Sequence, residues 1–348
     1  MRTLILVLLL ALLPLTAQEY PSRTRVMMGT YATVWLPKSD STKARYAFDA
    51  IAKAGKALSS FDEEALLYRL NATHKIAYDP LLAGALLESI RYHKETKGAF
   101  DITIGSVTKK LYRFGERVRR VDEGMRRMAA VRIEGIKITP SMIQTDSNIT
   151  LDLGGMGKGY GVDRAAALLA EHNVTRGRIA LGGDIRCLDL CKVGIESPYD
   201  SGLFAQIETH IPQVAISTSG TYRRYGITPE EHHLIDPKTK RPERHFHSVT
   251  LISLGDNSRL DAYATAVAVM PPAEALAFLK VHPEISFILV QSDGKILYDI
   301  DHAFLHLRWL PYKATATAHT TAAQTADRAT TAGGLIHPIV AQPLHIQR

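Results

Sequence analysis

ITLDLGGMGKGYGVDRAAALLAEH, at positions 149–172, places three local patterns in one short stretch. The residues of Ile149–Leu153 predict a short strand, and the glycine-rich run Gly154–Gly159 predicts a turn. The apolar spacing of Asp163–His172 predicts a helix. A strand, glycine turn and helix in this order could offer backbone N–H groups and a helix N-terminus to a phosphate, or could serve only for close packing.

The best-known nucleotide motifs do not account for this stretch. A Walker A loop needs Ser or Thr after its Lys, whereas Gly159 follows Lys158. The glycine spacing followed by an acidic residue that is typical of dinucleotide-binding folds is also missing. By itself the turn therefore identifies neither a ligand nor a reaction.

The flanking sequence predicts an α+β fold. A strand is expected at Tyr31–Leu36, and helices at Ala44–Leu58 and Asp79–Thr96. The other predicted strands are Arg178–Leu181, Val214–Ser217, His247–Leu254 and Ser286–Gln291. Because helices and strands do not alternate strictly, we expect mixed or antiparallel sheets packed by helices rather than a doubly wound sheet.

Composition narrows the class of protein. The chain has 348 residues, of which 46% are hydrophobic and 22% charged, so it can bury a large core. This excludes collagen, coiled coils and disulfide-stapled miniproteins. The net charge is 42 − 35 = +7, but the basic residues are scattered, which favours a solvated surface over a nucleic-acid-binding face.

Both ends of the chain differ from its middle. Arg2 precedes an apolar run at Leu4–Leu13, and a small residue, Ala17, follows, as in a secretory signal peptide. In 314–332, 15 of 19 residues are Ala or Thr, which predicts a disordered tail. We expect a signal peptide at 1–17, one domain at 18–312 and a tail at 313–348. The mature protein would be periplasmic, without a cysteine near the cleavage site for a lipid anchor.

Several polar residues could carry chemistry. Asp261 and Thr265 share one face of a predicted Ala-rich helix, where they could bind Mg²⁺, or Asp261 could simply favour the helix N-terminus. His233 precedes the Asp236-Pro237 turn and could be catalytic or structural. The hydroxyls of Ser217–Gly220 could bind phosphate or cap a helix.

Cys187 and Cys191 are the two cysteines of the chain. In an oxidising compartment they could be free or joined by a local disulfide, or they could form a redox-active pair. A structural role is favoured over the redox-active one. Zinc would need two further ligands, and no histidine has the usual spacing.

Taken together, the motifs resemble the ApbE family of FAD:protein FMN transferases from about Val26 to Tyr298. Each piece is short, but their order along the chain matches the family. The pieces are Met28–Thr30, Leu58–Phe61, Arg69–Asn71, Gly98–Thr103, Asp152–Asp163, Gly182–Arg186, Ser217–Tyr222, His233–Pro237 and Asp261–Thr265.

The resemblance implies a single compact ApbE-like domain, related to the T-fold, with FAD as substrate and Mg²⁺ as cofactor. Such an enzyme moves FMN from FAD to a Thr or Ser hydroxyl and releases AMP. Its partners would be extracytoplasmic or membrane redox proteins with FMN-binding domains, through which this chain could associate peripherally with the membrane. No nucleic-acid partner is expected.

The same resemblance assigns the site residues. The catalytic residues would be His233, as proton acceptor or phosphate-orienting group, and Asp261. Asp261, Thr265 and the Gly161 carbonyl would bind Mg²⁺, although the family often has Ala where Gly161 stands. The residues implied to contact FAD are Met28, Phe61, Ala99, Phe100, Asp101, Lys158 and Ile235.

Two other functions fit parts of the same pattern. An FAD pyrophosphatase would use water in place of the acceptor hydroxyl and release free FMN and AMP. A periplasmic FAD-binding carrier would need the aromatic and glycine-turn residues but not Asp261, Thr265 and His233 together. Because all three are present, the carrier ranks below both enzymes.

Overall fold

The computed structural model describes residues 20–115, 119, 121–221, 232–311 and 341–343. A nine-stranded sheet forms its centre, and all neighbouring strands run antiparallel except the pair β15–β17, which is parallel. In spatial order the strands are β1 (Ser22–Met27), β2 (Thr30–Trp35), β6 (Arg178–Leu181), β7 (Asp184–Cys187), β10 (Val214–Gly220), β13 (Phe246–Leu254), β14 (Ser286–Gln291), β15 (Ile296–Asp299) and β17 (Ala341–Pro343).

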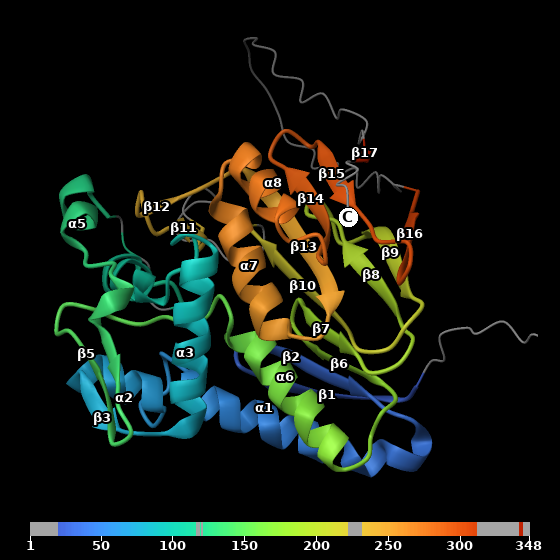
Figure 1. Cartoon of the computed structure of the whole chain (residues 1–348), viewed down its shortest axis with the longest axis horizontal. Coiled ribbons are helices and arrows are strands. Elements are labelled where there is room, and N and C mark those ends of the chain that lie inside the picture. Colours follow the sequence, from blue (N-terminus) through green and yellow to red (C-terminus); the bar gives the residue numbers. More distant parts are fainter. Residues whose placement is uncertain (1–19, 116–118, 120, 222–231, 312–340, 344–348) are drawn as a thin grey trace, which may run out of the picture.

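Helices cover one face of this sheet, and Figure 1 shows α6, α7 and α8 in front of the strands. α1 runs below them, and α3 stands beside α7 (Figure 1). The described α-helices of six or more residues are α1 (Ala44–Leu58), α2 (Leu66–Thr73), α3 (Pro80–Glu95), α5 (Glu123–Met128), α6 (Gly157–Glu171), α7 (Asn257–Val269) and α8 (Pro272–Lys280).

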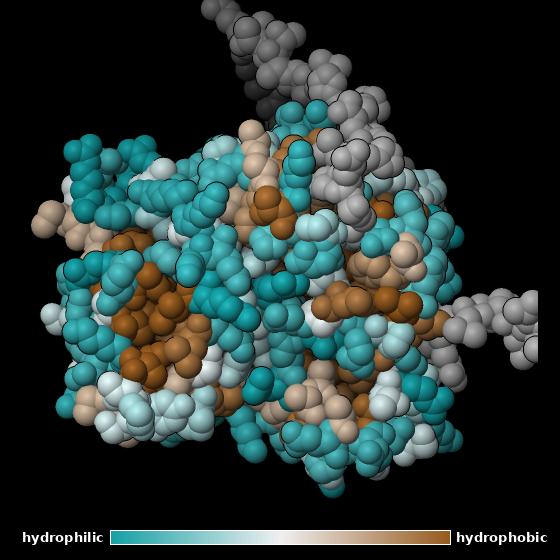
Figure 2. All heavy atoms as spheres, in the orientation of Figure 1, coloured by the Kyte–Doolittle hydropathy of each residue, from teal (hydrophilic) through white to brown (hydrophobic). Residues whose placement is uncertain are grey.

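Three small sheets complete the fold. Their strands are β16 (Leu305–Trp309), β9 (Leu203–Thr209) and β8 (Lys192–Glu196); β3 (Lys75–Ala77), β5 (Met142–Thr145) and β4 (Ile136–Ile138); and β11 (Ile235–Asp236) and β12 (Arg241–Pro242). The β16–β9–β8 sheet packs on the other face of the large sheet, against β7, β10, β13, β14 and β15. Figure 2 shows an apolar area between α3 and β5.

Strand periodicity explains how two cores lie on the two faces of one sheet. Ala215 and Leu251 are buried in the core that includes α7, while Ile216 and Ile252 are buried with residues of β8 and β9. Successive side chains of a strand point to opposite faces, so β10 and β13 contribute to both cores. Their nearly continuous apolar sequence reflects burial on both sides.

The α+β prediction is confirmed, as are most of the predicted elements. Helix Ala44–Leu58 and strands Arg178–Leu181 and Ser286–Gln291 have the predicted bounds. Asp79 is the N-cap of α3 rather than its first residue, because its side chain accepts hydrogen bonds from the N–H groups of Leu81 and Leu82.

The prediction for the glycine-rich stretch is partly correct: Gly154–Met156 form a turn, but the preceding strand and the end of the turn differ from the prediction. Ile149–Leu153 do not pair as a strand of any described sheet. Asn71 binds this segment by accepting from Leu151 N–H (2.7 Å) and donating to the Leu151 carbonyl (2.9 Å). The run Gly157–Gly159 is the first turn of α6, and Ser217–Gly220 is the end of β10 rather than a turn.

Both chain ends fall largely outside the described residues. The predicted signal peptide at 1–17 does so entirely, and so does the predicted tail apart from 341–343, which form β17 and pair with β15. Their assignment as domains stays a prediction. Among the described helices, none combines the length and apolar character that crossing a bilayer requires.

Candidate active site

Lys158, in the first turn of α6, lies between two carboxylates. Its Nζ is 2.9 Å from Asp184 Oδ2 on β7 and 3.0 Å from both carboxylate oxygens of Asp261 on α7. Both aspartates are buried. Ser217, on β10, donates a hydrogen bond to Asp184 Oδ1 (2.6 Å). Carboxylates from β7 and α7 thus meet at one ammonium group, and β10 supports one of them.

The charges of this cluster are strongly coupled. Burial and the nearby charge of Asp261 raise the pKa of Asp184 to about 7, against the opposing effects of Lys158 and Ser217. Burial lowers the pKa of Lys158, but the two carboxylates outweigh it and raise that pKa overall. Two ionised carboxylates and one ammonium would leave one net negative charge, so the cluster favours a further cation or proton.

The glycines of α6 allow this convergence because α6 and α7 nearly touch. A Cβ at Gly159 would lie 2.2 Å from the backbone oxygen of Asn257, a distance that no side chain tolerates. At this contact the Gly159 N–H donates to Asp261 Oδ2 (3.1 Å). Asp261 thus receives a backbone N–H from the first turn of α6 in addition to the Lys158 ammonium, and the positive end of the helix dipole adds to both.

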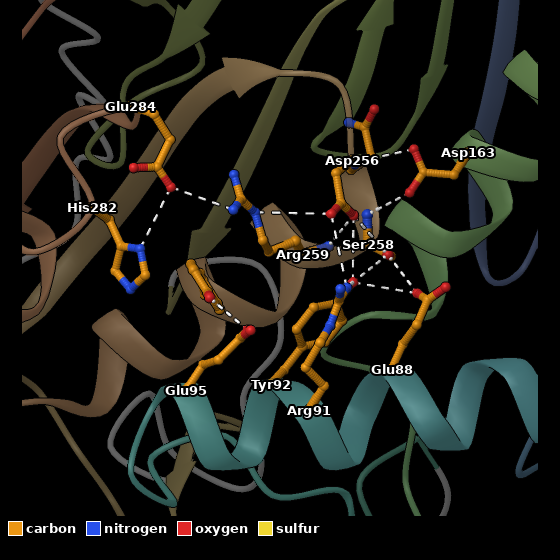
Figure 3. Close-up of polar contacts among 12 residues, drawn as sticks. Glu88, Arg91, Tyr92, Glu95, Asp163, Asp256, Ser258, Arg259, His282 and Glu284 are labelled. Carbon is orange, nitrogen blue, oxygen red and sulfur yellow. Dashed lines mark hydrogen bonds and ion pairs between the residues drawn. The ribbon is translucent and has the colours of Figure 1, made fainter.

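The start of α7 is fixed by side chains from its neighbours. Asp163 of α6 accepts hydrogen bonds from the N–H groups of Asn257 (2.9 Å) and Ser258 (2.7 Å). Figure 3 shows Asp163 and Asp256 meeting at this end of α7, beside Ser258. Tyr92 of α3 contacts Ser258 through its hydroxyl (2.8 Å). α7 therefore begins at Asn257, four residues before Asp261, and Asp261 is not the N-terminal acid that one interpretation of the sequence allowed.

Thr265 lies one turn beyond Asp261, as the spacing predicted. Its hydroxyl donates to the Gly155 carbonyl oxygen (3.2 Å), and a Cβ at Gly155 would be 3.0 Å from Thr265 Oγ1 and 3.3 Å from Phe100 Cε2. The segment before α6, Thr265 and Phe100 are thus in direct contact.

Gly161 lies on a different side of α6. A Cβ there would lie 3.3 Å from Leu181 Cδ2 and 3.5 Å from Met28 Sδ. Backbone carbonyls inside a helix point toward its C-terminus and accept from the residue four positions on, whereas Asp261 lies at the N-terminal end. The structure therefore does not support the predicted Gly161 carbonyl ligand, and it places the Gly155 carbonyl beside Thr265 instead.

The oxygen donors of this cluster fit a divalent cation such as Mg²⁺. Asp261 supplies a carboxylate, Thr265 a hydroxyl and Gly155 a backbone carbonyl, all of them hard ligands. Within the described part of the chain, no three His, Cys, Asp or Glu side chains form a metal cluster. A cation here would depend on neutral oxygens as well as on Asp261, and magnesium binding stays a prediction.

The residues predicted to contact FAD occupy two kinds of position. Phe61 is 51% exposed, and the Lys109 ammonium lies 3.6 Å from its ring centre, so one aromatic face is available near a positive charge. Ala99, Phe100 and Asp101 are buried, as is Ile235.

Two of these residues have clear structural roles. Asp101 caps a short helical turn by accepting from the Thr103 N–H (2.7 Å). The Met28 side chain packs between α1 and α6. A Cβ added at Gly55 of α1, or at Gly157 or Gly161 of α6, would contact it. Its φ of +49° places it in the tight turn between β1 and β2.

His233 lies two residues before β11, and its neighbour His232 is almost completely buried. The Leu234 N–H donates to His232 Nδ1 (3.3 Å), so that nitrogen is an acceptor and the ring is neutral. Burial, followed by the charges of His233 and His247, lowers the pKa of His232 to about 4.

This burial predicts a pH dependence of stability. The folded-state pKa of about 4 lies below the ordinary value of 6.5, so between these values the unfolded chain binds more protons at His232 and stability falls as the pH falls. This lowering of the His232 pKa corresponds to a loss of up to about 3 kcal/mol of unfolding free energy at pH 4. His232→Asn, which keeps an acceptor near Nδ1, should therefore gain unfolding free energy relative to the wild type as the pH drops from 6.5 to 4. Urea titrations along this range measure the difference, with exposed His302→Asn as control; a constant difference would contradict the prediction.

Asp184 belongs to this cluster although the sequence did not assign it a role, and Ser217 was considered there only as a phosphate ligand or helix cap. The Gly182–Arg186 piece belongs to the family pattern, but nothing local distinguished Asp184 from an ordinary residue at a strand start. One sequence signal could have pointed to Asp184: it is an acidic residue that directly follows two glycines in a segment with apolar flanks. Such an acid must find a buried partner, and Lys158 provides it.

Two further features lie outside this cluster. Cys187 and Cys191 form a disulfide, one of the alternatives left open by the sequence. A cavity of about 470 Å³ lies at the N-terminal end of α7, lined in part by Glu88, Arg91 and Arg164. Its lining includes neither Lys158 nor Asp261, so the geometry of the charged cluster, not the cavity, defines the candidate active site.

Comparison with known proteins agrees with this architecture. Residues 28–289 match the ApbE family. The FAD:protein FMN transferase of Escherichia coli K12 is 26% identical over 292 residues, covering 75% of this chain and 83% of the relative. The enzyme of the same name from Haemophilus influenzae is 25% identical over 312 residues, covering 81% and 90%.

Solved structures show the same fold. The ApbE protein of Thermotoga maritima superposes with a TM-score of 0.72 at 22% identity, covering 80% of this chain and 96% of its own. The flavin transferase ApbE of Vibrio cholerae gives a TM-score of 0.67 at 23% identity, covering 84% and 97%. Because the matched region includes the glycine-rich start of α6, Asp184, His233 and Asp261, the chain belongs to the ApbE family.

Proposed function

We propose that this protein is an FAD:protein FMN transferase that attaches FMN to a Thr or Ser hydroxyl of an acceptor protein and releases AMP. The main structural support for this proposal is the Lys158–Asp184–Asp261 cluster at the N-terminus of α6. The curated relatives named for this activity support it. The acceptors would be redox proteins with FMN-binding domains, and the predicted signal peptide supports a periplasmic location.

The chemistry requires charge control at a pyrophosphate. FAD carries two negative charges where the acceptor hydroxyl must attack, and more charge develops on the departing AMP. Lys158 and the N-terminus of α6 place positive charge here that offsets part of the charge of Asp184 and Asp261, and a bound cation would complete the compensation that the phosphates need. Asp261 and Thr265 would hold Mg²⁺, which when bound would neutralise the phosphate oxygens. The exposed ring of Phe61 offers a stacking surface for the flavin or adenine.

The attacking hydroxyl must also lose its proton. His233 is the candidate acceptor because an imidazole titrates near neutral pH and the residue lies in the ordered bend before β11. Its neighbour His232 is unsuited to this role, since its pKa is lowered to about 4 and its ring is buried. The burial of His232 thus leaves His233 as the better base of the pair.

An intact-mass measurement tests the function directly. The mature protein is incubated with FAD, Mg²⁺ and a purified FMN-binding domain, and the mass of that domain is followed with time. We expect a gain of one FMN phosphoester and the release of AMP. Free FMN and AMP without a mass gain would instead assign a pyrophosphatase, and intact FAD retained by the protein would assign a carrier.

His233→Ala should slow FMN transfer roughly 10²–10⁴-fold, the range for loss of a general base, while FAD affinity stays nearly constant. Single-turnover rates and FAD fluorescence titrations separate the two effects, with His302→Ala as the exposed control. Loss of FAD binding without slower transfer in the FAD-saturated enzyme would make His233 a binding residue.

A further inference from the structure

The hairpin formed by β1 and β2 ends beside the charged cluster. Its two turn residues, Met28 (φ +49°) and Gly29 (φ +71°), form a tight two-residue turn. A Cβ at Gly182 would lie 3.2 Å from Thr30 Oγ1 and 3.7 Å from Lys158 Cδ. The first residue after the turn therefore lies next to the stem of the lysine that holds Asp184 and Asp261.

β1 is an edge strand. Among the described strands it pairs only with β2, and Ser22–Val26 are all exposed. In a two-residue hairpin the pair next to the turn, Met27 and Thr30, exchanges hydrogen bonds, and the pattern then alternates along the ladder. The backbone N–H and C=O groups of Ser22, Thr24 and Val26 therefore point away from β2.

The same end of the hairpin exposes apolar side chains. Val26 and Tyr31 are directly opposite each other and are 74% and 68% exposed. Ala32 and Val34, which alternate with Tyr31, are buried on the other face against α1 and α6. On the face that carries Val26 and Tyr31, the core formed with β8 and β9 contains no residue of β1 or β2 among the described residues. An exposed strand edge thus borders an apolar patch near Lys158.

The charged residues of the hairpin itself are all positive, while Asp189 accepts a hydrogen bond from Tyr20 just before β1 (2.8 Å). Residues 20–37 include Arg23 and Arg25 but no Asp or Glu. Arg178 on β6 stacks over the Trp35 ring of β2 at 3.9 Å. An acidic segment would therefore be attracted to this edge, whereas a basic one would be repelled.

We propose that the exposed edge of β1 is the docking site for the acceptor protein, which adds an extended acidic segment as a further strand. This rests on the proposed function, because only a macromolecular acceptor needs such a surface. Main-chain hydrogen bonds to Ser22, Thr24 and Val26 hold the segment, and Val26 and Tyr31 receive its apolar side chains. Since each residue of a strand advances about 3.3 Å, a segment paired through Val26 reaches the Lys158 cluster within a few residues.

Thr24→Pro tests the strand pairing. Proline removes the outward N–H of Thr24 and leaves the ladder to β2 intact, which edge strands tolerate. Thr24→Ala is the matched control, since it loses the same hydroxyl contact to Thr33 and keeps the N–H. With an isolated FMN-binding domain as acceptor, we expect Thr24→Pro to raise the acceptor KM at least ~10-fold, with kcat and FAD affinity unchanged, and Thr24→Ala to stay near the wild type. Equal KM values for the two variants would overturn the docking site.

Val26→Glu and Val26→Lys provide a test that does not alter the backbone. Both side chains are similar in length and replace a residue that is mostly exposed, so both variants should fold. If the docked segment is acidic, Val26→Glu repels it and Val26→Lys attracts it, so the acceptor KM should be higher for Val26→Glu. The difference in KM should shrink as salt is added. The same KM for both would exclude the acidic segment.

Direct binding separates this inference from the proposed function. If the wild type transfers no FMN, the proposed function fails, and the affinity of the FAD-loaded protein for the FMN-binding domain then decides the docking site. Weaker binding by Thr24→Pro than by Thr24→Ala supports the site, and equal or no binding overturns it. A dimer of this chain that Thr24→Pro disrupts would assign the edge to a second copy and also overturn the proposal.

Discussion

Asp261→Asn should lower the rate of FMN transfer by roughly 10²–10³-fold, while FAD binding weakens only moderately. Asn keeps the shape of the side chain but removes the charge that lies 3.0 Å from Lys158 and accepts the Gly159 N–H. Removing one preorganised group at a centre of developing charge typically has an effect of this size. FAD contacts elsewhere, such as the Phe61 ring, are untouched.

Two measurements separate catalysis from binding in this variant. Single-turnover transfer at saturating FAD gives the chemical step, and fluorescence titration gives the affinity for FAD. Glu274→Gln, on the exposed side of α8, is the matched control for loss of one carboxylate. A transfer rate equal to that of the wild type at saturating Mg²⁺ would remove Asp261 from both the metal site and the catalytic centre.

Lys158→Met should have the largest effect on stability, lowering the free energy of unfolding by roughly 3–5 kcal/mol. The methionine fills a similar volume but leaves Asp184 and Asp261 buried together without their shared cation, and removing one partner of a buried ion pair has this cost. Transfer activity should be lost as well, because the positive potential at the start of α6 falls.

Urea unfolding of three variants checks this account. Lys109→Met is the matched control, since Lys109 is also mostly buried and lies 3.7 Å from a single carboxylate, Asp152, so its loss should be much smaller. Adding Asp184→Asn to Lys158→Met should recover part of the lost stability, because one uncompensated charge disappears. If the double variant is less stable than the single one, charge repulsion is not the cause.

The local elements were predictable because their signals are local. The apolar spacing of Ala44–Leu58 and the β-rich run Arg178–Leu181 gave correct bounds. Asp79 marked the start of α3 through its capping side chain, even though the helix proper begins one residue later. Such features depend on neighbours within four residues, which a sequence displays directly.

The glycine-rich stretch shows where local signals fail. Glycine has poor helix propensity, so Gly157–Gly159 pointed to a turn. In the structure these residues begin α6, and glycine is required there because a side chain at Gly159 would collide with the backbone of α7. The requirement for glycine comes from a contact with residues almost a hundred positions away, and tertiary packing outweighs propensity there.

The residues of the candidate site also fall into those that local sequence signals point to and those that only tertiary contacts add. The family motifs in the sequence proposed Lys158, His233, Asp261 and Thr265 as site residues, and the helical spacing put the last two on one face. Folding was needed to bring Asp184 and Ser217 to Lys158 and to place the Gly155 carbonyl beside Thr265. The physical reason is burial: a charge at a strand end becomes chemically informative only when folding removes its water and leaves one lysine as its partner.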